Sequence, residues 1–225
     1  MRSRQPEAGD PQAWPITFDV DAVVFDCDGV LVDSTESVER NWRRWAELVG
    51  LPAEAVPADV HGRSSRAAAE DLLPPEAVES AAALMEQLEI DDAGSVRAVA
   101  GARALLASVP ADRWAVVTSC TRPLFSARMA ASGLREPAIA VTADDVRRSK
   151  PHPDGYALAL LRLGVDPARA VVLEDAVAGI EAARAAGVRW VVRVGQGVSA
   201  SGADAVIADL RQARWTGRLE IAGSV

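Results

Sequence analysis

Residues 23–34 of the sequence are VVFDCDGVLVDS, in which three apolar residues run directly into Asp26 and a second acid, Asp28, follows two positions later. A short apolar run that ends near a turn residue such as Gly29 indicates a buried strand followed by a loop. Two carboxylates at the end of a buried strand are unfavourable unless a cation or a reaction occupies them. We therefore expect the rest of the chain to supply partners for Asp26 and Asp28.

Length and composition limit the class of protein. The chain has 225 residues, of which 49% are apolar and 25% are charged, typical of a globular protein with one large domain or one domain plus a small one. The net charge of −8 argues against a nucleic-acid partner. It does not exclude a small anionic substrate, because a metal ion and a few cations can reverse the field in one pocket.

Two further features bear on location. The two cysteines, Cys27 and Cys120, do not form a disulfide framework, and no apolar run approaches the roughly 18 residues that a membrane span needs. Residues 1–19 are rich in proline and charge without an apolar signal region, so we expect a flexible leader there. These observations predict a cytoplasmic protein with no membrane partner.

A helical segment follows the first strand. Apolar residues recur with the spacing of one helix face, at Val38, Trp42, Trp45, Ala46 and Val49. Gly50 and Pro52 end this helix. Further helices are expected over residues 65–73 and 76–88, separated by two prolines. Residues 36–96 are therefore predicted to form an inserted α-helical domain.

The pattern then changes to alternating strands and helices. After the first strand at residues 22–25, strands are expected at 114–117, 139–141, 170–173, 189–194 and 205–207, and helices at 101–108, 122–132, 153–163 and 177–186. Continuous apolar strands separated by helices indicate a parallel sheet covered on both faces. Residues 20–35 and 97–225 are thus predicted to form a doubly wound α/β core.

Polar residues gather where these strands end. The set comprises Asp26, Asp28, Thr118, Ser119, Glu174 and Asp175, together with Lys150 in a loop just before a helix. Ligand sites in open parallel sheets form at the carboxyl ends of the strands, so we expect these side chains to meet at one edge. Their convergence indicates a reaction site, although each short pattern alone is more typical of a turn, a helix cap or a solvated lysine.

The complete set resembles the haloacid dehalogenase-like hydrolase superfamily over about residues 20–195. Residues 26–34 match the phosphatase form of its first motif, DxDGxxxDS. Thr118-Ser119 after a strand, Lys150-Pro151, and Glu174-Asp175 before a glycine-containing helix match the other three motifs in the same order. The helical insert is similar to the family's small α-helical cap, and the resemblance implies a Rossmann-like core.

Within the family, the chain most resembles the β-phosphoglucomutase-like group, and in particular its sugar- and polyol-phosphate phosphatases. Residues 37–42, 61–63 and 114–119 carry this closer likeness. The mutases have a histidine ten residues after their second aspartate, whereas this chain has Val38. That difference favours a hydrolase over a phosphomutase.

The resemblance implies a role for each residue of the site. Asp26 is the expected nucleophile, which forms an aspartyl-phosphate, and Asp28 is the general acid and base. The metal is Mg²⁺, held by the Asp26 side chain, the Asp28 backbone carbonyl and Asp175, with Glu174 supporting or ligating it. Lys150 neutralises charge. The phosphoryl oxygens are bound by Thr118, Ser119 and backbone N–H groups of the loop from Cys27 to Gly29.

The implied substrate is a small phosphorylated sugar or polyol, and we expect the protein to act as a monomer. Two alternatives outside enzymatic hydrolysis remain: a signalling receiver domain, which is typically half this length with its acceptor on a later strand, and a binding protein with a dead site.

Among other polar residues, Arg63 and Arg66 are candidate substrate contacts, and His61 is either a structural group or a substrate contact. His152 is expected to support the Lys150 loop.

Overall fold

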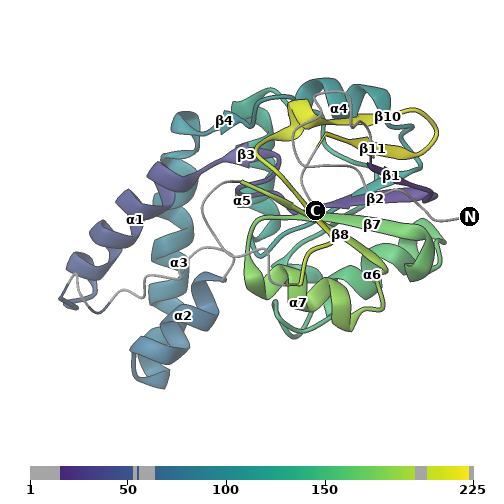
Figure 1. Ribbon diagram of the computed structural model, residues 1–225. Coiled ribbons are helices and arrows are strands. Elements are labelled where there is room, and N and C mark those ends of the chain that lie inside the picture. The colour runs from purple at the N-terminus through teal and green to yellow at the C-terminus, as the bar shows by residue number, and fades with distance from the viewer. Residues whose placement is uncertain (1–15, 53–54, 56–63, 196–201, 223–225) are drawn as a thin grey trace, which may run out of the picture.

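The computed structural model describes residues 16–52, 55, 64–195 and 202–222, and its centre is a six-stranded parallel sheet (Figure 1). The strand order is β6-β5-β2-β7-β8-β9, with bounds β2 Ala22–Phe25, β5 Trp114–Val117, β6 Ala140–Val141, β7 Ala170–Glu174, β8 Trp190–Val194 and β9 Ala205–Ile207. Every residue of β2, β5 and β7 is buried. Since β2 lies between β5 and β7, the acids that follow it emerge at the middle of the sheet edge.

Helices cover both faces of this sheet. On one face, Leu105 of α4 (Ala102–Ser108) and Phe125 of α5 (Arg122–Ser132) belong to one core cluster. On the other face, Tyr156 of α6 (Asp154–Leu163) and Ile180 of α7 (Val177–Ala185) belong to a second cluster. The predicted doubly wound α/β core is therefore confirmed. Short 3₁₀ turns occupy Ala93–Ser95, Ala143–Asp145, Pro167–Arg169 and Leu210–Gln212.

Three helices, α1 (Thr35–Leu48), α2 (Ser65–Leu72) and α3 (Pro75–Asp91), form a block to one side of the sheet (Figure 1). The block has a core of its own, in which the fully buried Trp45 donates from Nε1 to the Ala81 carbonyl at 2.8 Å. The predicted apolar face of the first helix is thus a packing face. We call α1–α3 the helical insert.

The chain enters and leaves the helical insert through two paired segments. β3 (Val32–Asp33) and β4 (Arg97–Ala98) lie antiparallel beside one another, with Val32 opposite Ala98. Asp92, just after α3, accepts hydrogen bonds from Ser37 at 2.7 Å and Asn41 at 3.2 Å, both on α1. These contacts hold the two connections together and fix how the insert leaves the core.

A second, antiparallel sheet was not expected. It has the order β1-β11-β10, with bounds β1 Ile16–Phe18, β10 Ala213–Trp215 and β11 Leu219–Ile221. The prediction of a leader over residues 1–19 is therefore wrong for its last part, because residues 16–18 pair with β11. A three-residue strand whose partner lies at the other end of the chain gives no local periodicity to read.

No helix among the described residues combines the length and the apolar character that crossing a membrane requires.

Candidate active site at the carboxyl edge of the sheet

Asp26 lies directly after β2 and is almost completely buried, with 3% of its surface exposed. Its Oδ1 accepts a hydrogen bond from Lys150 Nζ at 2.7 Å. The same ammonium donates to Glu174 Oε1 at 2.6 Å, so one buried cation serves two buried carboxylates. The structure thus brings Lys150 together with Asp26, 124 residues away along the chain, and with Glu174, 24 residues away.

Glu174 ends β7, and protein donors engage both of its carboxylate oxygens. Oε1 accepts from Tyr156 Oη at 2.7 Å as well as from Lys150. Oε2 accepts from the backbone N–H groups of Asp175 at 2.9 Å and Ala176 at 3.0 Å. Glu174 therefore fixes the position of the Lys150 ammonium and of the turn that presents Asp175.

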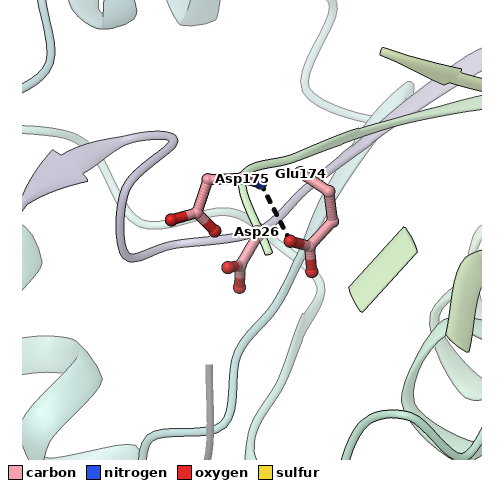
Figure 2. A group of neighbouring side chains, drawn as sticks. All are labelled: Asp26, Glu174 and Asp175. Atoms are coloured by element: carbon pink, nitrogen blue, oxygen red, sulfur yellow. Dashed lines mark hydrogen bonds between the residues drawn. The ribbon is translucent and has the colours of Figure 1, made fainter. Parts of the chain in front are cut away.

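The carboxylates of Asp26, Glu174 and Asp175 form a group suited to a divalent cation (Figure 2). One oxygen from each lies within 4.8 Å of the others. Burial and the neighbouring charge of Glu174 raise the pKa of Asp26 well above its usual range, and the same two causes raise the pKa of Asp175 to about 7. Like charges brought this close in a buried site are stabilised when a hard cation is bound among them.

Two glycines lie so close to these carboxylates that a side chain would not fit at either position. Gly29 has a φ of +78°, and a Cβ there would lie 2.0 Å from Asp175 Oδ2. A Cβ at Gly179 would lie 1.6 Å from Glu174 Oε1. The loop after β2 thus passes close to the Asp175 carboxylate. The residues present fit Mg²⁺, which prefers oxygen ligands.

The raised pKa of Asp175 makes the stability of the metal-free protein depend on pH. A folded-state pKa of about 7, against an ordinary 3.8, means that the stabilising contribution is complete below pH 3.8 and is lost as the pH rises through 7. In EDTA, we expect the melting temperature to fall between pH 5 and pH 8. Asp175→Asn should flatten this dependence, with a gain on the order of a few kcal/mol at pH 8.

Thermal unfolding in EDTA and in Mg²⁺ measures this effect. At pH 8, Mg²⁺ should recover the melting temperature that the wild type loses in EDTA. The exposed Asp112→Asn variant should show the same pH dependence as the wild type. Equal pH slopes for wild type and Asp175→Asn would contradict the assignment.

The candidates for binding phosphoryl oxygens lie beside Asp26. Thr118 follows β5 and is buried, and its Oγ1 accepts from the Cys120 N–H at 3.1 Å. Thr118 and Ser119 line the same cavity as Asp26. In the loop after β2, the Gly29 N–H donates to the Val32 carbonyl at 2.8 Å. This contact leaves the amides of Cys27 and Asp28 as the loop donors to consider for a phosphate.

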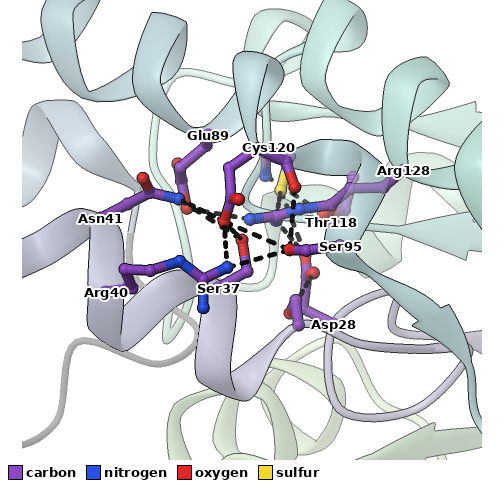
Figure 3. Close-up of polar contacts among 11 residues, drawn as sticks. Asp28, Ser37, Arg40, Asn41, Glu89, Ser95, Thr118, Cys120 and Arg128 are labelled. Atoms are coloured by element: carbon purple, nitrogen blue, oxygen red, sulfur yellow. Dashed lines mark hydrogen bonds and ion pairs between the residues drawn. The ribbon is translucent and has the colours of Figure 1, made fainter.

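The surroundings of Asp28 include residues that sequence reasoning missed. Asp28 Oδ1 accepts from Ser34 Oγ at 2.7 Å, and Oδ2 lies 2.9 Å from Arg128 Nη1 (Figure 3). Cys120 Sγ donates to the same oxygen at 3.1 Å. One feature of the sequence could have indicated that Arg128 belongs to the site. It lies on the buried face of α5 among apolar residues, where an arginine needs a partner.

A cavity of about 480 Å³ lies between this edge of the sheet and the helical insert. Its inner wall includes Asp26, Asp28 and Thr118, while Trp42 and Arg66 contribute from the insert. Arg66 is also ion-paired with Glu79, and its role as a substrate contact stays a prediction. Arg63 and His61 lie outside the described residues.

His152 takes part in the loop that carries Lys150, as expected. Its N–H donates to the Ser149 carbonyl at 3.0 Å, which closes a turn around Lys150 and Pro151.

Comparison with known proteins identifies the family. A model described as haloacid dehalogenase-like hydrolase matches residues 20–187. The chain belongs to the haloacid dehalogenase-like hydrolase family. It is 40% identical over 172 residues to hexitol phosphatase A of Escherichia coli, covering 73% of this chain and 78% of that protein. The predicted enzyme class, a phosphoric monoester hydrolase, is confirmed.

Solved structures share the fold of this chain. A hydrolase from Pseudomonas syringae superposes with a TM-score of 0.77 at 24% identity, covering 85% of this chain and 94% of that one. A protein from Thermotoga maritima assigned as a beta-phosphoglucomutase gives a TM-score of 0.62 at 29% identity, covering 83% and 94%. The resemblance inferred from the four motifs is therefore confirmed at the level of family and fold.

Proposed function

We propose that this hydrolase removes phosphate from small phosphorylated sugars or polyols through an aspartyl-phosphate on Asp26. One observation carries the proposal: a buried carboxylate, Asp26, is held by Lys150 at the inner wall of a cavity, and a second carboxylate, Asp28, lines the same cavity two residues later. A nucleophile and a proton carrier so placed are what the transfer of a phosphoryl group requires. The name of the Escherichia coli relative, a hexitol phosphatase, supports this substrate class.

In the first step, a carboxylate oxygen of Asp26 attacks phosphorus and the bond between phosphorus and the sugar oxygen breaks. Asp28 gives its proton to that leaving oxygen, so the sugar departs as a neutral alcohol. Lys150 stays beside Asp26 and offsets negative charge as the phosphoryl group arrives. Thr118 and Ser119, with the amides of Cys27 and Asp28, bind the phosphoryl oxygens.

In the second step, Asp28 takes a proton from water, and the water oxygen attacks phosphorus. The bond between phosphorus and Asp26 breaks, which releases phosphate and restores both aspartates. Asp26, Asp175 and the Asp28 carbonyl would hold Mg²⁺, with Glu174 in support, and the bound ion supplies positive charge between the carboxylates and the phosphate. The helical insert acts as a cap that keeps bulk water from the first step.

The cavity lining favours an uncharged leaving group. Besides Asp26, Asp28, Asp175 and the Glu89–Arg128 pair, the described residues that line it include the acids Glu70, Glu79, Glu86 and Asp144 and the bases Arg66 and Arg147. Arg66 is already paired with Glu79, and Thr121 donates a hydrogen bond to Glu86. Carboxylates bind hydroxyl groups well and repel a second phosphate or a carboxylate. A neutral polyhydroxy group suits this lining.

A phosphomutase and a signalling receiver domain fit the structure less well than a phosphatase. A phosphomutase has to retain a sugar bisphosphate, whose second phosphate would face these acids. Val38, where mutases carry histidine, is 7% exposed and packs in the apolar core of the helical insert. Against a receiver domain, the acceptor candidate follows the first strand of the core sheet and a helical insert adjoins it.

Phosphate release in Mg²⁺ from a panel of sugar, polyol and nucleotide monophosphates tests the proposal. We expect the fastest turnover with neutral polyol or sugar esters such as sorbitol 6-phosphate, and loss of activity in EDTA that Mg²⁺ reverses. Slow turnover is expected for esters whose leaving group carries a carboxylate or a second phosphate. Isomerisation of β-glucose 1-phosphate without phosphate release would show a mutase instead.

A further inference from the structure

A buried arginine connects the helical insert to Asp28. Arg128 lies on α5 of the core and is 2% exposed. Its Nη1 is 2.9 Å from Asp28 Oδ2, and its Nη2 donates to Glu89 Oε1 at 2.9 Å (Figure 3). Glu89 belongs to α3 of the insert and is itself 6% exposed. One guanidinium therefore spans two carboxylates that come from different parts of the fold.

The charges of this group depend on one another. Burial alone would lower the pKa of Arg128, but the carboxylates of Asp28 and Glu89 raise it well above its usual value, so the guanidinium stays charged. A buried charge is tolerated only with partners of opposite sign. Arg128 Nε has no hydrogen-bond partner among the residues that the structure describes. The two ion pairs and the contact with Cys120 therefore determine where the guanidinium sits.

The orientation of Asp28 follows from the same contacts. Ser34 holds one carboxylate oxygen, and Arg128 with Cys120 holds the other. Cys120 is itself bound to Arg128, whose Nη1 donates to Sγ at 2.8 Å. A displacement of Arg128 would therefore leave this oxygen of Asp28 with only the weak thiol donor of Cys120. Proton transfer needs the acid within hydrogen-bond reach of the leaving oxygen, so its orientation affects the rate directly.

We infer that Arg128 is a positioning residue for Asp28, and that Glu89 on the helical insert holds Arg128 in place. The position of the insert over the core thereby sets the position of the proton carrier. This inference rests on the proposed role of Asp28 as general acid. It assigns to α3 a function beyond lining the cavity: its Glu89 fixes a group of the core that touches Asp28.

The dependence of rate on the leaving group separates positioning from general structural damage. The nitrophenolate of p-nitrophenyl phosphate departs without a proton, whereas the alkoxide of glycerol 1-phosphate needs one. The ratio kcat/KM covers steps up to the departure of the leaving group, so it reports the acid and not the later attack by water. General acid catalysis contributes roughly 10²- to 10⁴-fold.

We expect Arg128→Lys and Glu89→Gln to lower kcat/KM for glycerol 1-phosphate about 10-fold or more beyond any loss for p-nitrophenyl phosphate. Asp28→Asn should give the same selective loss, only larger. Asp91→Asn, which removes a carboxylate from the same α3 at an exposed position where its partner is Gln87, is the matched control and should leave both values near wild type. Glu89→Gln keeps the size of the side chain, so the inference stays testable if Arg128→Lys fails to fold.

The results with the three variants separate the acid role of Asp28 from the positioning roles of Arg128 and Glu89. If Asp28→Asn slows both substrates equally, the proposed general-acid role is wrong. If Asp28→Asn is selective but Arg128→Lys and Glu89→Gln slow both substrates equally, the acid role stands and the inference is overturned. Selective loss in all three variants supports both.

Discussion

Replacement of Asp26 by asparagine is expected to reduce phosphate release by at least about 10⁴-fold, with the fold retained. The reason is chemical: the amide has nearly the same size as the carboxylate but cannot form the acyl-phosphate, and removing a nucleophile has effects of this order in other enzymes. Hydrolysis of p-nitrophenyl phosphate in Mg²⁺ measures the rate. Rapid quenching with labelled substrate should detect an acid-stable label on the wild type and none on Asp26→Asn.

The matched control is Asp112→Asn, which makes the same change at an exposed position before β5, at the opposite end of that strand from the site. It should retain wild-type turnover. Circular dichroism and melting temperature show whether Asp26→Asn is folded. A folded Asp26→Asn protein that still hydrolyses p-nitrophenyl phosphate at more than a hundredth of the wild-type rate would contradict the assignment of the nucleophile.

Replacement of Lys150 by methionine is expected to affect stability as well as activity. Lys150 is almost fully buried between Asp26 and Glu174, at 2.7 Å and 2.6 Å, and the attraction of these two acids keeps its pKa well above the usual value although burial opposes this. Removing one partner from a buried ion pair costs about 3–5 kcal/mol, because the remaining charges are left without compensation. Turnover should fall as well, since the nucleophile loses its counter-charge.

Urea unfolding in EDTA measures the stability change without compensation from a metal. Mg²⁺ should recover part of the loss, because the ion neutralises the same carboxylates. Arg148→Met removes a cation two residues earlier from an exposed pair with Asp154, and we expect almost no change in stability from it. If Lys150→Met proves as stable as Arg148→Met in EDTA, the ion pairs of Lys150 with Asp26 and Glu174 do not stabilise the fold as expected.

Much of this site could be predicted because of where strands end. Asp26, Thr118 and Glu174 each lie at or directly after the end of an apolar run, and parallel strands deliver their carboxyl ends to one edge. The meeting of Asp26 with Glu174 follows from that geometry, whereas Lys150 reaches both from the loop before α6. The apolar spacing of Val38, Trp42 and Trp45 likewise gave the helix and its buried face.

The sequence alone therefore determined the order of the core-sheet strands and the longer helices along the chain, the doubly wound core and the residues gathered at its edge, since local periodicity and chain direction encode all three. Only the tertiary structure decided that residues 16–18 pair with β11, that acids of the helical insert such as Glu70 and Glu86 line the cavity, and that Arg128 joins Asp28 to Glu89. Each of these is a contact between segments far apart in the chain, and such contacts depend on how whole layers pack. The VVFDCDG stretch identified Asp26 and Asp28 as candidate site residues, whereas the packing of α3 and α5 showed what holds Asp28 in place.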